Sequence, residues 1–134
     1  MASLEQIEIL LVEDSAEDAE MTLRALRKNH LANRVHWVKD GEEALAYLFN
    51  SQAPKLVMLD LKMPKVDGIE VLRQLKADAT TRHIPIIVLS AHAMRNDREM
   101  ALGAGGDEFD TKPVHFEQLL VKIAALLAKA AIVQ

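Results

Sequence analysis

The sequence Leu56-Val57-Met58-Leu59-Asp60 is a short apolar run that ends directly in a carboxylate. Continuous apolar runs of this length are typical of parallel strands that are buried on both faces. Three further apolar runs are followed by other polar side chains. Ile7–Val12 is followed by Glu13-Asp14, Ile84–Leu89 by Ser90, and a weaker run that reaches Phe109 is followed by Lys112-Pro113. Because ligands of open α/β sheets bind outside the carboxyl ends of the strands, we expect three carboxylates, a hydroxyl and an ammonium around one crevice. Such a set suits a divalent cation and a phosphoryl group.

The composition indicates one globular domain with no preference for nucleic acid or membrane. The chain has 134 residues, of which 50% are hydrophobic, so it can bury a core. Its net charge is −4 and no basic run exceeds Arg27-Lys28, which gives no attraction to a nucleic acid. It has no cysteine, and no apolar run approaches the length of a membrane span. We therefore expect a single cytoplasmic domain over residues 1–134, with its core at about 6–129, no direct DNA binding and no membrane contact.

Strand and helix patterns alternate five times along the chain. Apolar runs predict strands over 7–12, 34–38, 56–59, 84–89 and 106–109. Apolar residues at helical spacing predict a helix after each strand, at about 16–28, 41–49, 69–75, 94–102 and 116–127. Since crossovers between parallel strands are right-handed, the alternation predicts a doubly wound α/β sheet with helices on both faces. The run at 34–38 is more polar than the others, which favours an edge strand.

Local signals predict how individual helices begin and end. Ser15 can cap the first helix, with Asp18 three residues on as a weaker version of the capping box. Gly103 suits a left-handed cap after the fourth helix. The Ala-rich segment Ala124–Val133 is predicted to be mostly core-facing helix. Trp37, on the second strand, is interpreted as a packing residue.

Two adjacent acids, Glu13 and Asp14, follow the first expected strand. Carboxylates that pack together repel, which is costly without a cation, so Mg²⁺ binding is one interpretation. An N-capping cluster on the first helix is the other. Asp60 favours the metal, because a core position after Leu-Val-Met-Leu has no use for a carboxylate. Asp60 itself could be a metal ligand, a nucleophile or a general base.

A hydroxyl and an ammonium complete the set of residues at strand ends. Ser90 or Lys112 alone would indicate little, because serine often ends a strand and most lysines are solvated. Together they suit the oxygens of a phosphoryl group. The peptide bond from Lys112 to Pro113 can be cis, which would hold the lysine in one direction.

The chain resembles the receiver domain of two-component response regulators over essentially its whole length. The motifs that carry the resemblance are Leu-Val-Glu-Asp at 11–14, Leu-Asp-Leu-Lys-Met-Pro at 59–64, Asp67-Gly68, Ser90-Ala91 and Thr111-Lys112-Pro113. All five occur in register, which is highly specific. The resemblance implies a flavodoxin-like (βα)5 sandwich whose parallel strands lie in the order 2-1-3-4-5. It also implies a stand-alone, single-domain regulator in a bacterial signalling system, without an output domain.

The resemblance implies a role for each matched residue. Asp60 would take a phosphoryl group from a phosphohistidine on a sensor histidine kinase or a phosphotransfer protein. Mg²⁺, or Mn²⁺ in its place, would be organised by the side chains of Glu13, Asp14 and Asp60 and the backbone carbonyl of Lys62. Among these groups Glu13 would act through water. Ser90 and Lys112 would bind the phosphoryl oxygens, and the small Ala91 would leave the donor access to the site.

The resemblance also implies how the switch works. An aromatic residue on the fifth strand, here Phe109, would turn inward together with the hydroxyl. The face made by the fourth helix, fifth strand and fifth helix would then change for a downstream protein target. Lys62 and His92 occupy positions that tune the lifetime of the phosphoryl group in the family. Lys62 would either slow dephosphorylation by restricting the attacking water or simply point to solvent.

Three other functions are weaker interpretations of the same residues. A phosphatase or phosphotransferase that forms an aspartyl phosphate would usually carry a second acid where this chain has Lys62, so we expect a signalling switch rather than an enzyme. A constitutive binding module would not need the five strand-end groups. A flavodoxin-like cofactor protein would need a phosphate loop where this chain has Glu13-Asp14. The segment Ala130–Val133 would either add apolar contacts in a homodimer or fray into solvent.

Overall fold

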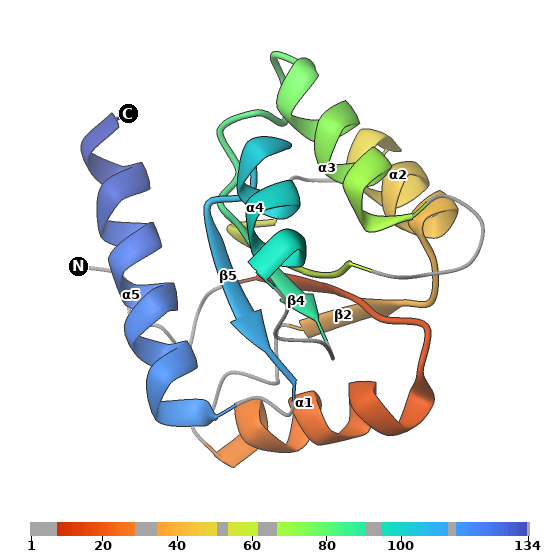
Figure 1. Ribbon diagram of the computed structural model, residues 1–134, viewed down its shortest axis with the longest axis vertical. Helices are drawn as coiled ribbons and strands as arrows, with labels where there is room; N and C mark the ends of the chain where they lie inside the picture. The colour runs from red at the N-terminus through yellow and green to blue at the C-terminus, as the bar shows by residue number, and fades with distance from the viewer. Residues whose placement is uncertain are drawn as a thin grey trace.

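Parallel strands and helices alternate along the whole chain. The computed structural model describes residues 8–28, 35–50, 54–61, 67–90, 95–112 and 115–133, and within them five strands form one sheet flanked by five helices (Figure 1). In chain order the elements are β1 (Ile9–Val12), α1 (Ala16–Lys28), β2 (Val35–Val38), α2 (Gly41–Asn50), β3 (Leu56–Asp60), α3 (Gly68–Ala77), β4 (Ile86–Ser90), α4 (Arg95–Gly103), β5 (Glu108–Thr111) and α5 (Phe116–Val133). Within these ranges, no helix is long and apolar enough to cross a membrane.

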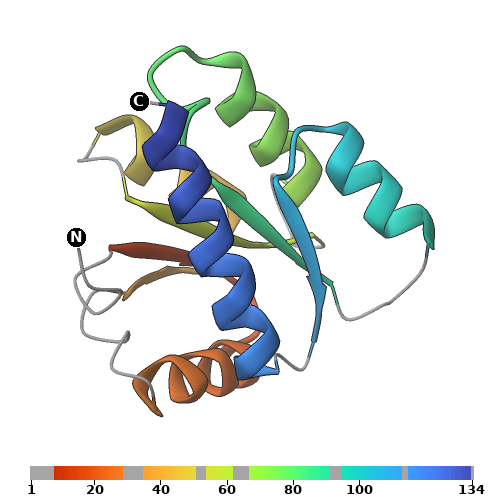
Figure 2. The ribbon, with the colours of Figure 1, turned by 90° about the vertical axis from the view of Figure 1, so that its left-hand side faces the viewer.

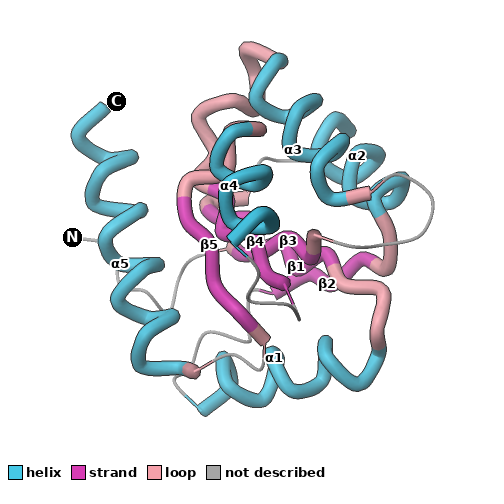
Figure 3. Tube along the Cα trace, in the orientation of Figure 1, coloured by secondary structure: helices cyan, strands magenta, loops and turns pink. Residues whose placement is uncertain are grey.

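The strands lie in the order β2-β1-β3-β4-β5, which confirms the predicted flavodoxin-like topology (Figure 3). All four pairings are parallel, so the carboxyl ends of the strands meet at one edge of the sheet. Val12 lies opposite Leu59, and Ser90 lies opposite Thr111. The residues that follow these positions are therefore neighbours in space, although they are far apart in the sequence.

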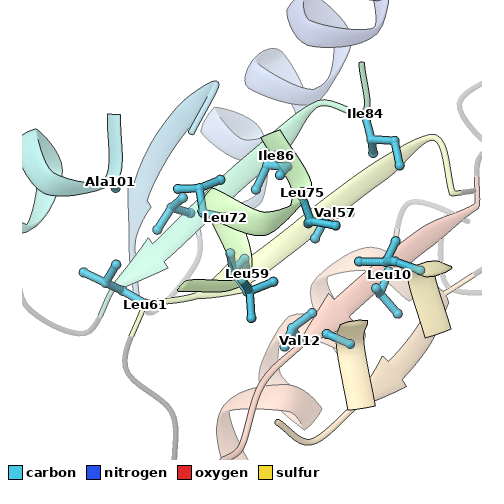
Figure 4. Close-up of a cluster of buried hydrophobic side chains, with 14 of the residues drawn as sticks. Leu10, Val12, Val57, Leu59, Leu61, Leu72, Leu75, Ile84, Ile86 and Ala101 are labelled. Carbon is cyan, nitrogen blue, oxygen red and sulfur yellow. The ribbon is translucent and has the colours of Figure 1, made fainter. Parts of the chain in front are cut away.

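Side chains along each strand alternate between two apolar clusters, one on each face of the sheet. On β3, Val57 and Leu59 join the cluster under α2, α3 and α4 (Figure 4). Leu56 and Met58 join the cluster under α1 and α5, where α5 crosses the sheet (Figure 2). The same alternation holds at the carboxyl ends of the strands. It places the side chains of Glu13, Asp60 and Lys112 on the face of the sheet that α1 and α5 cover, and that of Ser90 on the face that α4 covers.

One glycine adopts a backbone conformation that side chains disfavour, and it is not the predicted one. Gly105 has a φ of 112°, whereas Gly103 is the last residue of α4. The helix end is completed by the Gly105 N–H, which donates to Leu102 O at 3.2 Å, and by the Gly106 N–H, which donates to Ala101 O at 2.9 Å. The left-handed cap therefore lies two residues after Gly103, and that prediction is wrong.

The boundaries of the last elements also differ from the prediction. Gly106 still belongs to the turn that closes α4, so β5 covers residues 108–111 instead of 106–109. In α5, Ala124, Ala125, Ala128 and Lys129 are exposed, so over residues 124–129, where burial is described, the prediction of a mostly core-facing segment is wrong. The inward stripe is made by leucine and isoleucine at helical spacing, at positions 119, 123, 126 and 127. Alanines between them face outward because they offer little area to bury.

Candidate functional site

Three carboxylates meet at the carboxyl ends of β1 and β3, which are adjacent in the sheet. Glu13, Asp14 and Asp60 each offer one oxygen that lies within 4.8 Å of the oxygens of the other two. Glu13 and Asp60 are buried, and Asp14 is exposed. The structure thus brings together the three acids that the sequence places at strand ends. Asp60 is itself the last residue of β3, one residue further than the predicted strand.

Both the backbone and the carboxylate of Glu13 are hydrogen-bonded to neighbouring parts of the chain. Its N–H donates to Val38 O at 3.1 Å, and its carbonyl accepts the indole N–H of Trp37 at 2.8 Å. Its carboxylate accepts the Ser15 N–H at 3.2 Å and the Lys112 ammonium at 2.8 Å. A fully buried carboxylate is stable only with such partners, and the contacts fix the direction of this side chain.

The backbone after Asp60 is held tightly against the start of α3. The Leu61 N–H donates to Leu89 O at 2.8 Å, and the Gly68 N–H donates to Leu61 O at 3.1 Å. A Cβ at position 68 would lie only 2.5 Å from Asp60 O, so glycine is required for this approach. The close contact keeps the main chain of Asp60 at the sheet edge beside Glu13.

Lys112 lies among the acids as their internal counter-ion. Its Nζ lies 2.8 Å from Glu13 Oε1, 2.8 Å from Asp18 Oδ2 and 3.4 Å from Asp60 Oδ1. Its backbone N–H donates to Ser90 O at 2.8 Å. Burial acts to lower the pKa of Lys112, but the hydrogen bonds to Asp18 and Glu13 and the charge of Asp60 raise it above its ordinary value. Lys112 is therefore a permanent positive charge at this site.

The acid cluster makes Asp60 a much weaker acid than an exposed aspartate. Burial and the negative charge of Glu13 raise the pKa of Asp60 from 3.8 to about 7, and Lys112 offsets only part of this rise. Hydrogen bonding with the neighbouring Asp14 and Glu13 carboxylates raises the pKa of Asp60 further, because only the protonated form of Asp60 can donate to them. The site therefore has a strong tendency to take up positive charge, either as a proton or as a cation.

Ser90 and Phe109 lie on the other face of the sheet, toward α4. The Ser90 hydroxyl donates to Asp97 Oδ2 at 3.3 Å, and Asp97 belongs to the first turn of α4. Phe109 is buried in the apolar cluster that includes Ala101 of α4. In this structure the Phe109 ring is thus already directed inward. Four residues of the predicted site lie outside the described residues: Lys62, Ala91, His92 and Pro113. The expected cis bond before Pro113 therefore lies outside them as well.

Three residues of the site make contacts that the sequence does not predict. Asp18 is predicted only as a capping residue. Its N–H does donate to Ser15 Oγ at 3.2 Å, and its carboxylate in addition binds Lys112. Asp97 accepts from Ser90, and Trp37 binds the Glu13 carbonyl rather than serving in packing alone. The only sequence signal for Asp18 and Asp97 is an acid in the first turn of a helix that follows a site strand.

The donor set fits a hard divalent cation. Three carboxylates supply oxygen ligands only, which Mg²⁺ and Mn²⁺ prefer, and among the residues that the structure describes no imidazole joins this cluster. The raised pKa of Asp60 is a second sign that the cluster is deficient in positive charge. Glu13, Asp14 and Asp60 can therefore hold such an ion.

Known proteins that are similar in sequence to this chain indicate one family. The model of the response regulator receiver domain matches residues 9–124. The chain is 38% identical over 116 residues to the probable methanogenesis regulatory protein FilR2 of Methanothrix harundinacea (strain 6Ac), covering 83% of this chain and 75% of that protein. The response regulator MprA of Mycobacterium sp. (strain KMS) is also 38% identical, and the match covers 93% of this chain and 52% of that protein.

Solved structures agree with the sequence comparison. The bacteriophytochrome response regulator AtBRR is 42% identical with a TM-score of 0.80, and the match covers 91% of this chain and 92% of that one. The receiver domain of the sensor histidine kinase PA1611 from Pseudomonas aeruginosa PAO1 is 31% identical with a TM-score of 0.82, over 91% of this chain and 98% of that one. That receiver domain carries a magnesium ion in its active-site cleft. The sequence motifs, the strand order and these matches agree, and the chain belongs to the receiver domains of two-component response regulators.

Proposed function

We propose that this chain acts as a single-domain response regulator, which takes a phosphoryl group from a phosphohistidine onto Asp60 and thereby changes a surface for a partner protein. The observation that carries the proposal is a buried carboxylate at the end of the central strand, with two further acids and an ammonium around it. A structural role alone would not favour this arrangement, because burial and Glu13 oppose the ionised form of Asp60.

The transfer needs the ionised form of Asp60. One of its carboxylate oxygens attacks phosphorus, and the new P–O bond forms as the P–N bond to the donor imidazole breaks. The imidazole nitrogen keeps the bonding electrons and takes up a proton from water. Glu13, Asp14 and Asp60, with the backbone carbonyl of Lys62, would hold Mg²⁺ or Mn²⁺. When bound, this cation offsets the negative charge of the carboxylates and of the phosphoryl oxygens.

Two side chains would change partners once the phosphoryl group is in place. Lys112 would exchange its hydrogen bond to Asp18 or Glu13 for one to a phosphoryl oxygen. The Ser90 hydroxyl would leave Asp97 and donate to a second phosphoryl oxygen. Ala91 would leave room for the donor, and a cis bond before Pro113 would keep the lysine directed at the site.

The movement of Ser90 would reach the surface through α4. Asp97 lies in the first turn of this helix, so losing the Ser90 hydroxyl alters the environment of a nearly buried carboxylate there. Phe109 already packs inward in the same cluster as Ala101 of α4, so it would not need to turn inward when Ser90 moves. The face made by α4, β5 and α5 is the proposed surface for the downstream target, and a coupling of about 1–3 kcal/mol is normal for such a switch.

The partners follow from this chemistry. A sensor histidine kinase or a phosphotransfer protein would supply the phosphoryl group, and the output would be a protein contact or a further transfer to histidine. The protein would act in the cytoplasm as a switch rather than as an enzyme, without binding DNA, as a monomer or a homodimer. Lys62 and His92 would set the lifetime of the aspartyl phosphate.

Intact-mass spectrometry tests the proposal. The protein is incubated with Mg²⁺ and acetyl phosphate, and in parallel with a panel of phosphorylated histidine proteins. The expected result is one added phosphoryl group that disappears in the Asp60→Asn variant and in a metal-free sample. If every donor failed with the parent protein, a constitutive binding module would replace the phosphoswitch as the best account.

A further inference from the structure

The edge strand β2 holds the main chain of Glu13 from both ends. The Glu13 N–H donates to Val38 O at 3.1 Å, which continues the parallel ladder between β1 and β2. The Glu13 carbonyl accepts the indole N–H of Trp37 at 2.8 Å. A side chain therefore supplies the second of these two hydrogen bonds.

The indole takes the place of a backbone donor that the strand cannot provide. In a regular parallel ladder the next donor on β2 would come from residue 40. At Asp40 the chain has already left the strand, and its carboxylate caps α2 by accepting the Glu43 N–H at 2.8 Å. Trp37 lies opposite Leu11 in the register, two residues before Glu13, and its long side chain reaches forward to the carbonyl.

The carbonyl bound by Trp37 belongs to the peptide that joins Glu13 to Asp14. Fixing the plane of this peptide fixes the backbone from which the exposed Asp14 carboxylate extends toward Asp60. We infer that Trp37 is a positioning residue for the acidic cluster: its indole N–H orients the peptide before Asp14 and so increases the affinity of the cluster for a divalent cation. This inference rests on the metal site in the proposed function.

The variant Trp37→Phe keeps an aromatic ring and removes the N–H. Loss of this partly buried hydrogen bond to the backbone that carries Asp14 is expected to weaken Mg²⁺ binding about threefold to tenfold. The affinity is measured without any phosphoryl donor, from the rise of the melting temperature with Mg²⁺ concentration. Leu126→Ala is the matched control, because Leu126 packs against the same apolar cluster as Trp37 and belongs to α5. It should lower the melting temperature and leave the Mg²⁺ affinity unchanged.

The chain has a single tryptophan, so a nitrogen–proton NMR spectrum contains one indole signal, which reports on the surroundings of this N–H. In the parent protein this signal should move during a Mg²⁺ titration and saturate at the affinity found by melting. In the Asp14→Asn variant it should need far more Mg²⁺ to move. An indole with only a packing role would give a signal that ignores the metal.

These measurements distinguish a failure of the positioning role of Trp37 from a failure of the metal site itself. If the parent binds Mg²⁺ and Trp37→Phe binds it within about twofold of the parent, the inference is wrong and the proposed function stands. If the parent shows no response to Mg²⁺ in either measurement, the metal site fails and the inference fails with it.

Discussion

Replacing Asp60 with asparagine is expected to stabilise the metal-free protein, and to do so more strongly at alkaline pH. Burial and Glu13 raise the pKa of Asp60 to about 7, whereas an unfolded aspartate has a pKa of 3.8. Below the unfolded pKa both states are protonated, so the group has no effect. Between the two values only the unfolded state ionises, so stability falls as the pH rises, and the full cost is present above about 7. Asparagine cannot ionise and avoids this cost.

The two pKa values set the size of the effect. At ~1.4 kcal/mol for each tenfold change, a carboxyl whose pKa differs this much between the two states destabilises the fold by about 4 kcal/mol above neutral pH. Roughly 2–3 kcal/mol of this cost develops between about pH 5 and pH 8. The difference in free energy of unfolding between Asp60→Asn and the parent should grow by that amount over this interval.

Urea denaturation followed by circular dichroism, with a chelator present, measures this difference. Asp67→Asn is the matched control: it makes the same chemical change at the exposed cap of α3, and asparagine can also cap a helix. Adding Mg²⁺ at the higher pH should stabilise the parent more than Asp60→Asn and narrow the gap. A gap that changes by less than about 0.5 kcal/mol between the two pH values would refute the account of Asp60 as a destabilised acid.

Three other substitutions test the same site. Gly68→Ala places a Cβ 2.5 Å from Asp60 O and should cost about 2–4 kcal/mol in urea denaturation, whereas Gly103→Ala, with nothing within 4 Å, should be neutral or slightly stabilising. Asp18→Asn weakens the ion pair between Lys112 and residue 18, which competes with the phosphoryl group for the ammonium. Labelling by acetyl phosphate should therefore speed up about twofold to fivefold, and an unchanged rate would exclude this competition. Lys112→Met removes the cation beside the buried Glu13 and should lower stability by about 3–5 kcal/mol, part of which Mg²⁺ restores in a thermal melt.

The strands were predictable because this fold buries its central strands on both faces. The runs ending at Val12, Leu59 and Leu89 are continuous and apolar, and nothing else in a chain of this composition demands such runs. The prediction failed where local chemistry decides a boundary. Gly103 and Gly105 both suit a helix end, and the choice depends on which carbonyls of α4 are left to be bonded.

The grouping of the site residues was predictable for a topological reason, and their contacts were not. Parallel strands force Glu13, Asp60 and Lys112 to one edge of the sheet, so order along the chain is enough to gather them. The partners of these groups come from helices and from the edge strand, at distances set by packing. The bonds that Trp37 and Asp97 make cross from one element to another, and no spacing in the sequence indicates them.

The position of the phosphoryl group tests the central claim most directly. The protein is phosphorylated with Mg²⁺ and a phosphohistidine donor, the acyl phosphate is reduced with borohydride, and the digested peptides are sequenced by mass spectrometry. The account predicts homoserine at position 60, and only there, with no such product when Mg²⁺ is withheld. Modification at another residue, or an equal yield without the metal, would contradict the assignment of Asp60 as the metal-assisted phosphoryl acceptor.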